Sequence, residues 1–529
     1  MTAVELTMTD IEQLLARART APLNEDDDKI IRAMAETLFY LRELASDNET
    51  TIQQLRQILS RPGSEKMRDL FEKLNLEPKP AAKPPETGSP ADKKPGHGRN
   101  GAKAYTGAKR VRVQHPSLKT GQRCPECDKG RLYGQNQPAT LIRIVGQAPI
   151  QATVYELEKL RCNLCGEVFT AAAPEGVGSE KYDATSASMV ALLKYGSGLP
   201  FHRLERLQGS MGIPLPASTQ WDIVSEAAER IEAAHEELIR QAAAGDVLYN
   251  DDTSMKILEL MKHGANDDDF PDRTGIFTSG IVSTQEGRKI ALFFTGRKHA
   301  GENLSDVLAE RAKAIRPPIQ MCDALSRNVP KELEVILAHC IVHGRRRFVE
   351  VAANFPEECR YVLEILGQVY KNDAIAREQE MSPEDRLRFH QARSGPLMTQ
   401  LHEWFAQQLE ERKVEPNSGL GSAIAYMNNH WHALTLFLRQ AGAPLDNNIC
   451  ERALKKVILH RKNALFYKTQ NGAHVGDIFM SLISTCQLSG ANPFDYLTAL
   501  HRNSPELSRN PHQWMPWNYR ETLARAPSV

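Results

Sequence analysis

The hydrophobic pattern of this chain changes at residue 246, and this change limits the fold more than any other feature does. Three runs follow, 247–251, 275–282 and 289–295, and each reads as a strand bounded by turn residues. A helix is expected at 304–314 and a fourth strand at 318–322. These residues therefore predict an α/β domain, with a sheet and at least one helix packed on it.

Three meandering strands, a helix and a further strand are the element order of a ribonuclease H-like domain. Residues 350–440 carry helical patterns without a strand candidate, and a strong helix start at 446–448 leads into Glu451. We therefore assign 244–500 to a ribonuclease H-like α/β catalytic domain with a helical insertion at about 350–440. Residues 501–529 are assigned to a C-terminal tail.

Residues 1–62 predict a helix that pairs with another helix. Two seams repeat every seven residues between about 27 and 60, three positions apart: Ile31, Leu38, Ala45, Ile52 and Leu59, and Met34, Leu41, Asn48 and Leu55. We favour a dimerising coiled coil over a helix packed on its own protein, with Asn48 placed to fix the register. A proline-rich linker at 63–98 follows it.

A basic arm comes next. From Lys93 to Arg123 the chain has nine basic residues and no acidic one. An arm of this kind suits contact with phosphate groups, and a solvated tail is the alternative. The candidate DNA-contacting residues of the arm are Arg99, Lys103, Lys109, Arg110 and Arg112.

Two Cys-x-x-Cys pairs predict a zinc ribbon, so we assign 99–175 to the basic arm and this ribbon. Strand-like runs at 140–145 and 153–157 separate the pairs. One pair alone would also fit a redox site, but two pairs supply four thiolates and close a tetrahedral, structural Zn²⁺ site. The expected ligands are Cys124, Cys127, Cys162 and Cys165.

Residues 176–243 predict a module built of helices, with Ser218 as the expected N-cap of one of them. The series is similar to a helix-turn-helix DNA-binding module, and a plain helical connector fits the pattern equally well. Together the segments predict a multidomain α+β chain.

Charge and hydropathy limit the classes of partner. The chain has 66 Lys+Arg and 66 Asp+Glu, and a formal net charge of zero does not by itself favour nucleic acid. The zero is an average, because the basic arm and the segment after Glu451 are locally cationic. We find no signal-peptide pattern and no run approaching the ~20 apolar residues of a membrane helix, so we expect an intracellular protein without a membrane partner.

Three carboxylates stand where the sheet and the late helix are expected to meet. Asp251 ends the first strand, Asp323 follows the fourth, and Glu451 lies in the first turn of the late helix. Three converging carboxylates can hold two Mg²⁺ ions for phosphoryl transfer. The strand alone does not decide between Asp251 and its neighbour Asp252. Helix capping is an alternative role for Asp323 and Glu451, as is pairing of Glu451 with Lys455.

Several stretches resemble transposases of the insertion-sequence-66 family. The most specific is Pro-Leu-Asp-Asn-Asn-Ile-Cys-Glu-Arg-Ala-Leu at 444–454. Shorter matches lie at 248–253, 319–323, 340–348, 381–386 and 461–466, and the resemblance covers about residues 98 to 500. The chain departs from the family in two places. It has Asp252 where the family usually has Glu, and Ala324 where the family often has Gly.

This resemblance implies a DDE-type DNA transposase whose acidic triad is Asp251, Asp323 and Glu451, with Mg²⁺ or Mn²⁺ at the catalytic site and a structural Zn²⁺. Such an enzyme cleaves the ends of an insertion sequence and joins them to target DNA by two-metal phosphoryl transfer. The implied partner is double-stranded DNA. Assembly as a homo-oligomer, accessory transposition proteins and a nucleoid-associated location in the bacterial cytoplasm are further expectations.

Basic residues near the triad are expected to hold DNA, although a solvated turn is the alternative for the first three. They are Arg345, Arg346, Arg347, Arg452, Lys455, Lys456, Arg461 and Lys462. Cys340-x-x-His343 precedes the three consecutive arginines, and its spacing is that of one half of a zinc site. We favour packing and hydrogen bonding for this pair, because no second half is nearby in the sequence.

Two other functions remain open at this point. One is a catalytically inactive DNA-binding protein derived from a transposase, and the other is a metal-dependent nuclease that cleaves without joining strands. The sequence has no Gly-x-x-x-x-Gly-Lys-Ser/Thr phosphate loop, so the use of ATP has no support.

Overall fold

The structure is a computed structural model, and it describes residues 103, 108–127, 129–133, 140–161, 163, 165, 167–178, 180–263, 273–331 and 333–525. The expected coiled coil and linker, Arg99 and Cys162 lie outside these residues. The chain divides into two compact units, which are described separately. One contains Pro174–Arg206 and Leu215 onward, and the other contains Lys79–Ala173 and Leu207–Pro214. Within the described part of the chain, no helix combines the length and the apolar character that crossing a membrane requires.

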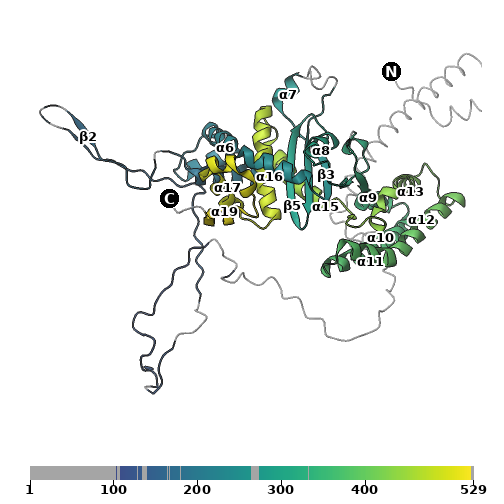
Figure 1. Cartoon of the computed structure of the whole chain (residues 1–529), viewed down its shortest axis with the longest axis horizontal. Helices are drawn as coiled ribbons and strands as arrows, with labels where there is room; N and C mark the ends of the chain where they lie inside the picture. The colour runs from purple at the N-terminus through teal and green to yellow at the C-terminus, as the bar shows by residue number, and fades with distance from the viewer. Residues whose placement is uncertain are drawn as a thin grey trace, which may run out of the picture. The chain divides into compact units, whose positions relative to one another are not determined.

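A five-stranded mixed sheet organises the larger unit (Figure 1). Its strands, in the spatial order β5-β4-β3-β6-β7, are β3 (Val247–Ser254), β4 (Phe277–Gln285), β5 (Arg288–Gly296), β6 (Ile319–Cys322) and β7 (Ile336–His339). β3, β4 and β5 form an antiparallel meander, whereas β6 and β7 continue the sheet in parallel with β3. The four expected strands are confirmed. The four residues of β7 are too few to show a period, so the pattern did not reveal it.

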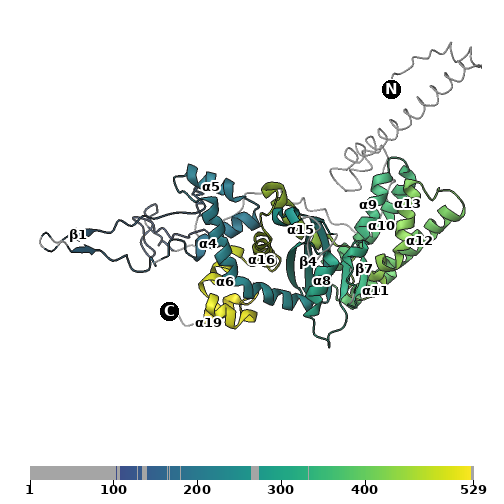
Figure 2. The ribbon, with the colours of Figure 1, turned by 90° about the horizontal axis from the view of Figure 1, so that it is seen from above.

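Helices cover both faces of this sheet (Figure 2). α15 (Asn448–Ala464) packs on β3 and β4 from one side, and α6 (Ala217–Ala243) and α8 (Ala300–Ala309) pack from the other. α8 begins earlier than the helix expected at 304–314, because His299 and Glu302 form a capping box at its start. A short helix, α7 (Leu258–His263), follows β3.

α16 (Gln470–Leu488) runs along β5, the outermost strand of the sheet, and supplies the hydrogen bonds that a neighbouring strand would give. Three of its polar side chains, spaced four residues apart, lie on one helix face: Asp477, Ser481 and Thr485. They accept hydrogen bonds at 2.6, 3.0 and 3.1 Å from the backbone N–H groups of Thr295, Phe293 and Ala291, respectively. The polar edge of β5 is therefore covered.

A helical insertion lies between β7 and α15, as the absence of strand patterns at 350–440 predicts. Its elements are α9 (Ile341–Val351), α10 (Pro356–Glu378), α11 (Pro383–Arg393), α12 (Gly395–Glu410), α13 (Gly419–Asn429), α14 (Trp431–Leu434) and η4 (Leu436–Leu438). Phe348 of α9 stacks on Phe405 of α12 with ring centroids 5.9 Å apart, and both are fully buried. This apolar core continues to Met321 in β6, so the insertion is packed on the sheet.

The helical prediction for 183–240 is confirmed by α4 (Ala184–Ala191), the π-helical turn η2 (Leu192–Gly196), α5 (Phe201–Ser210) and α6. The predicted cap was wrong. α6 begins at Ala217 after Pro216, so Ser218 already lies inside the helix. Proline fixes its own φ near the helical value and suits a helix start without a capping side chain.

Residues 501–525, expected to belong to a C-terminal tail, instead lie in packed helices: the last two residues of α17 (Pro493–Arg502), α18 (Ser504–Arg509), η5 (Pro511–Gln513) and α19 (Tyr519–Arg525). α17 and α18 contact α6. Trp514 is fully buried, and its carbonyl accepts a hydrogen bond of 2.8 Å from the Tyr496 hydroxyl. The helices after α17 have seven residues or fewer and show less than two turns of periodicity, which explains why the sequence pattern resembles a tail.

In the smaller unit, β1 (Lys159–Arg161) pairs with β2 (Val168–Thr170) on either side of the second cysteine pair. The strands expected at 140–145 and 153–157 were wrong, because the structure gives these residues no strand partner. Leu141 and Ile144 are exposed. Their β-branched and apolar neighbours favour extended backbone locally, but a strand also needs a paired neighbour.

Gly280 of β4 offers a test of how closely α15 packs on the sheet. A Cβ atom at this position would lie 2.9 Å from Cγ of Leu454, whereas a Cβ at Gly296 meets no atom within 4 Å. We expect Gly280→Ala to lower the free energy of unfolding by about 1–3 kcal/mol through overpacking. Gly296→Ala is the matched control and should change it by less than about 0.5 kcal/mol. Urea unfolding measures both, and equal stability of the two variants would contradict close packing.

Candidate active site at the ends of β3 and β6

The predicted carboxylates come from three elements that meet at one end of the sheet. β3 and β6 are parallel, with Tyr249 paired to Met321. Continuing this register by two residues places Asp323 beside Asp251. Glu451 lies in the first turn of α15, the helix that covers this face. The fold therefore brings together Asp251, Asp323 and Glu451, although they are far apart in the sequence.

Two hydrogen bonds fix α15 over the middle of β3. The Asn447 side chain, at the N-cap position of α15, donates a bond of 3.0 Å to the Asn250 carbonyl. One turn later, the Cys450 thiol donates a bond of 3.2 Å to the Gly280 carbonyl, and Gly280 pairs with Asp251 in the β3–β4 ladder. Sequence reasoning did not assign these two positioning residues, although both lie in the 444–454 motif.

The electrostatics of Asp251 show that the carboxylates act on one another. Burial and the charges of Asp323, Asp252 and Glu451 together raise the pKa of Asp251 to about 7, against a lowering by the Asp252 N–H. Asp323 accepts a hydrogen bond of 3.2 Å from the Leu325 N–H and another from the Asn328 side chain. A divalent cation would neutralise this repulsion, so the donor set fits a hard ion such as Mg²⁺.

The alternation of β3 separates Asp251 from Asp252. Asp251 lies on the α15 face, so Asp252 points to the opposite face. There its carboxylate, which is 2% exposed, is 3.2 Å from His299 Nδ1 and 3.2 Å from an Arg327 guanidinium nitrogen. Asp252 is therefore held by contacts within the protein. The sequence did not decide whether Asp251 or Asp252 faces the site, and the structure assigns Asp252 to a structural ion pair.

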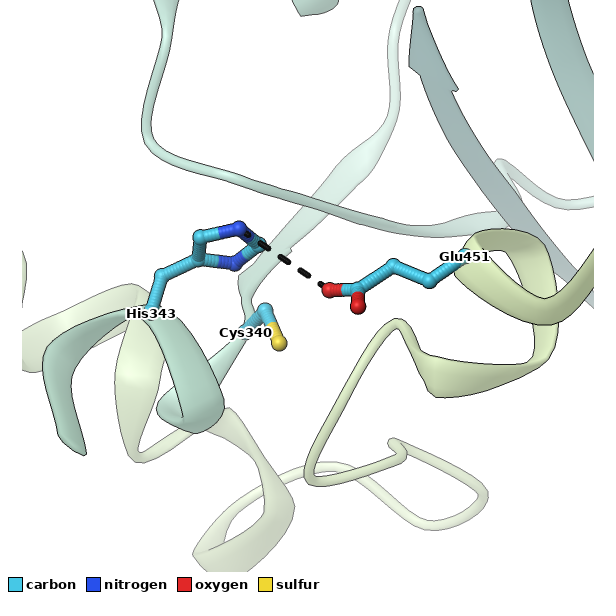
Figure 3. Close-up of side chains that lie close together, drawn as sticks. All are labelled: Cys340, His343 and Glu451. Carbon is cyan, nitrogen blue, oxygen red and sulfur yellow. Dashed lines mark ion pairs between the residues drawn. The ribbon is translucent and has the colours of Figure 1, made fainter. Parts of the chain in front are cut away.

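Cys340, His343 and Glu451 form a compact cluster next to these carboxylates (Figure 3). Cys340 is the N-cap residue of α9 and His343 lies in its first turn, whereas Glu451 comes from α15. His343 Nε2 lies 3.8 Å from Glu451 Oε1. Burial raises the pKa of the Cys340 thiol to about 12, against lowering by backbone N–H groups that include that of Asn447.

A pocket of about 410 Å³ opens beside Asp323, between β6 and the helical insertion. Its walls include His343, Arg346 and Arg347 of α9 and Tyr426 of α13. The Arg347 guanidinium lies 4.1 Å from the centroid of the Tyr426 ring. The pocket thus presents cationic and aromatic groups next to a carboxylate, which is a combination suited to a nucleotide.

The structure places the predicted DNA-contacting residues in different settings. In α15, Arg452, Lys455 and Lys462 are exposed, but Lys456 donates a hydrogen bond of 3.2 Å to Ser484 of α16. Arg461 donates a bond of 3.1 Å to Thr253. The last two side chains thus tie α15 to its neighbours. In the smaller unit, Lys103, Lys109, Arg110 and Arg112 are exposed.

The first cysteine pair lies in a hydrogen-bonded turn. Hydrogen bonds from the backbone N–H groups of Gly130 and Lys129, and from Cys124, lower the pKa of the Cys127 thiol. The Cys124 N–H donates a bond of 2.8 Å to the Gly130 carbonyl, which closes the turn. Thiolates stabilised in this way fit Zn²⁺.

Comparison with known proteins identifies the family. A family model described as "Transposase IS66 family" matches residues 181–475, more than half of the chain. The chain belongs to the IS66 family of transposases. This confirms the resemblance found in the sequence, and the matched segment includes the whole sheet, the helical insertion and α15.

Three relatives from Sinorhizobium fredii (strain NBRC 101917 / NGR234) are described only as uncharacterized proteins. Protein y4jD is 27% identical over 356 residues, covering 63% of this chain and 65% of its own length. Protein y4hP is 25% identical over 435 residues, covering 78% and 76%. Protein y4qI is 22% identical, covering 63% and 61%. The match thus spans less than two thirds of y4jD and y4qI.

The raised pKa of Asp251 predicts a stability that depends on pH when no divalent metal is bound. The native state keeps a proton that the unfolded state releases, so stability falls as pH rises from about 4 to about 7. At pH 8 with a chelator, Asp251→Asn should be more stable than the unmodified protein by about 2–4 kcal/mol. This gain should disappear near pH 4.

Asp306→Asn is the control for this measurement, because Asp306 is an exposed carboxylate of α8 outside the cluster. Urea unfolding at both pH values gives the comparison. A gain of equal size for the two variants would show that the effect is not specific to the cluster.

Proposed function

We propose that this IS66-family protein is a DDE transposase whose catalytic carboxylates are Asp251, Asp323 and Glu451. The observation that carries this proposal is their convergence beside the middle of β3, the end of β6 and the start of α15, where burial and the neighbouring carboxylates raise the pKa of Asp251. The strand order β5-β4-β3-β6-β7, with its antiparallel meander and parallel extension, supports a ribonuclease H-like core.

The three carboxylates would hold two divalent cations, Mg²⁺ or Mn²⁺, through hard oxygen ligands. Bound there, the ions supply activation of a water or a 3′-hydroxyl and stabilisation of the leaving oxygen. The protein's part is to fix the ligands. β3 and β6 hold the two aspartates side by side, and Asn447 and Cys450 anchor the helix that carries Glu451. The reactions would be cleavage at the ends of an insertion sequence and joining of those ends to target DNA.

The pocket beside Asp323 supports a position for the DNA strand. Arg346 and Arg347 line it, and the exposed Arg452 and Lys455 follow Glu451 on α15. Arg345, which lies on α9 with Arg346 and Arg347, is half-buried. Phosphate groups entering the site would therefore meet cations close to the proposed metal ligands.

The smaller unit supports a second contact with DNA. Its exposed cations and its cysteine turn fit an arm and a structural zinc ribbon that bind the element ends. Zn²⁺, homo-oligomerisation, accessory transposition proteins and a place near the bacterial nucleoid belong to this proposal. So does a DNA-binding role for the helices of 176–243.

Two related functions lack one or both of these steps. A metal-dependent nuclease would cleave without joining, and an inactive DNA-binding protein would do neither. The acidic cluster favours a cleaving enzyme over an inactive one, because three carboxylates brought together without a cation raise the pKa of Asp251 and so cost stability at neutral pH.

Loss of any triad carboxylate should abolish cleavage without abolishing DNA binding. We expect Asp251→Asn, Asp323→Asn and Glu451→Gln each to slow Mg²⁺-dependent cleavage of a labelled element end by at least about 100-fold, because each removes a metal ligand. Asp306→Asn is the control and should cleave normally. Binding without cleavage by the unmodified protein, with accessory proteins supplied, would identify the inactive alternative, and cleavage without joined product would identify the nuclease.

Arg347 should contribute to DNA binding through its charge. We expect Arg347→Gln to weaken binding of an element end and to reduce the salt dependence of log K by about 1, the change for one phosphate contact. Arg509→Gln, at an exposed position in α18, removes the same charge outside the pocket. Fluorescence anisotropy at several salt concentrations measures both. If log K depends equally on salt concentration in the two variants, Arg347 does not contact the DNA as proposed.

A further inference from the structure

The Cys340-x-x-His343 motif supplies two of the ligands that a metal site needs. The fold adds a third potential ligand from a distant segment of the chain. Glu451 enters the cluster from α15, more than a hundred residues further along the chain. One ligand atom from each side chain lies within 4.8 Å of the other two. Figure 3 shows the imidazole and the carboxylate facing one another, with the sulfur beside them.

The spacing of these atoms is close to that of a bound metal site. A tetrahedral ion with bonds of about 2.0–2.3 Å separates its ligand atoms by roughly 3.3–3.8 Å. His343 Nε2 and Glu451 Oε1 are already 3.8 Å apart. Side-chain rotation that moves the other atoms by about 1 Å would complete the triangle, with a fourth position left for a water or a phosphate oxygen.

Two buried polar atoms of the cluster have no hydrogen-bond partner among the described residues. They are Glu451 Oε1 and His343 Nδ1. The Cys340 sulfur accepts a bond of 3.2 Å from the Asn447 N–H. Buried polar atoms without partners are costly, and a bound cation would compensate the buried carboxylate oxygen directly.

The chemistry of the three donors selects the kind of ion. Sulfur, imidazole nitrogen and carboxylate oxygen together suit a borderline ion such as Zn²⁺, whereas Mg²⁺ requires oxygen ligands. We propose that Cys340, His343 and Glu451 form a binding site for a Zn²⁺-class transition-metal ion beside the carboxylates of Asp251 and Asp323. The Glu451 carboxylate has two oxygens, so it can serve this ion and a neighbouring one.

This site is separate from the zinc ribbon and does not require the proposed reaction. Its ligands lie in the larger unit, and metal binding is measurable without DNA. If the protein does not cleave DNA, the proposed metal site is therefore unaffected. If the metal does not bind, the proposed acidic triad is still tested by the variants of its own residues.

The test is the metal content of the purified full-length chain. Metal-free protein is loaded with Zn²⁺, freed of excess ion by gel filtration and analysed for zinc per chain by mass spectrometry. We expect Cys340→Ala and His343→Ala each to hold one ion fewer than the unmodified protein. Cys359→Ala, which removes a buried thiol of α10 outside the cluster, is the matched control and should hold the same number.

Cobalt provides a second readout that separates this site from the ribbon. After loading with Co²⁺ alone, the difference spectrum between the unmodified protein and Cys340→Ala should show sulfur-to-cobalt charge transfer from one thiolate. His343→Gln should weaken Co²⁺ binding at this site by at least about 10-fold, and circular dichroism checks that each variant is folded.

Three results would overturn the proposal. Equal zinc content in Cys340→Ala and Cys359→Ala would show that the cluster is only a packed ion pair. Absence of the charge-transfer band from the difference spectrum would exclude the sulfur ligand. Loss of the same ion in Asp251→Asn would assign it to the acidic triad. Retention of the ion in Asp251→Asn, with its loss in the Cys340 and His343 variants, would support the separate site.

Discussion

The Asn447–Asn250 hydrogen bond is the interaction on which the arrangement of the acidic site depends. It joins the start of α15 to the middle of β3, and the Cys450 thiol adds a second attachment to β4 one turn later. Glu451 directly follows the second anchor in the sequence. A helix held at two points cannot rotate about its axis, so the direction of the Glu451 side chain follows from bonds made by its neighbours.

The sheet and the insertion were largely predictable from the sequence, because long segments with a clear period carry the strongest signal. The meander at 247–295 and the helices of 350–440 are of this kind. β7 and the last helices were not predictable, since four to seven residues span too little of a period. Local propensity also placed strands at 140–145, where no neighbouring chain completes a ladder.

The candidate site was predictable in composition and not in geometry. Its three carboxylates follow from their places at element ends, but a strand pattern does not say whether Asp251 or Asp252 faces α15. The β3–β4 register and the ion pairs of Asp252 with His299 and Arg327 decide that question. The approach of Glu451 to His343 depends on how the starts of α9 and α15 are held together, and no local sequence pattern indicates contact between two distant segments.

The way α16 covers β5 limits how this protein can associate with others. Asp477, Ser481 and Thr485 occupy the backbone N–H groups that an incoming strand would need, so the sheet cannot grow by strand addition at that end. Burial raises the pKa of Asp477 to about 8, so this carboxyl group is protonated at neutral pH and carries no charge in the apolar interior. Contacts with other chains at this edge therefore have to form through side chains on the helical surface, and such contacts can be changed by single substitutions without reopening the sheet.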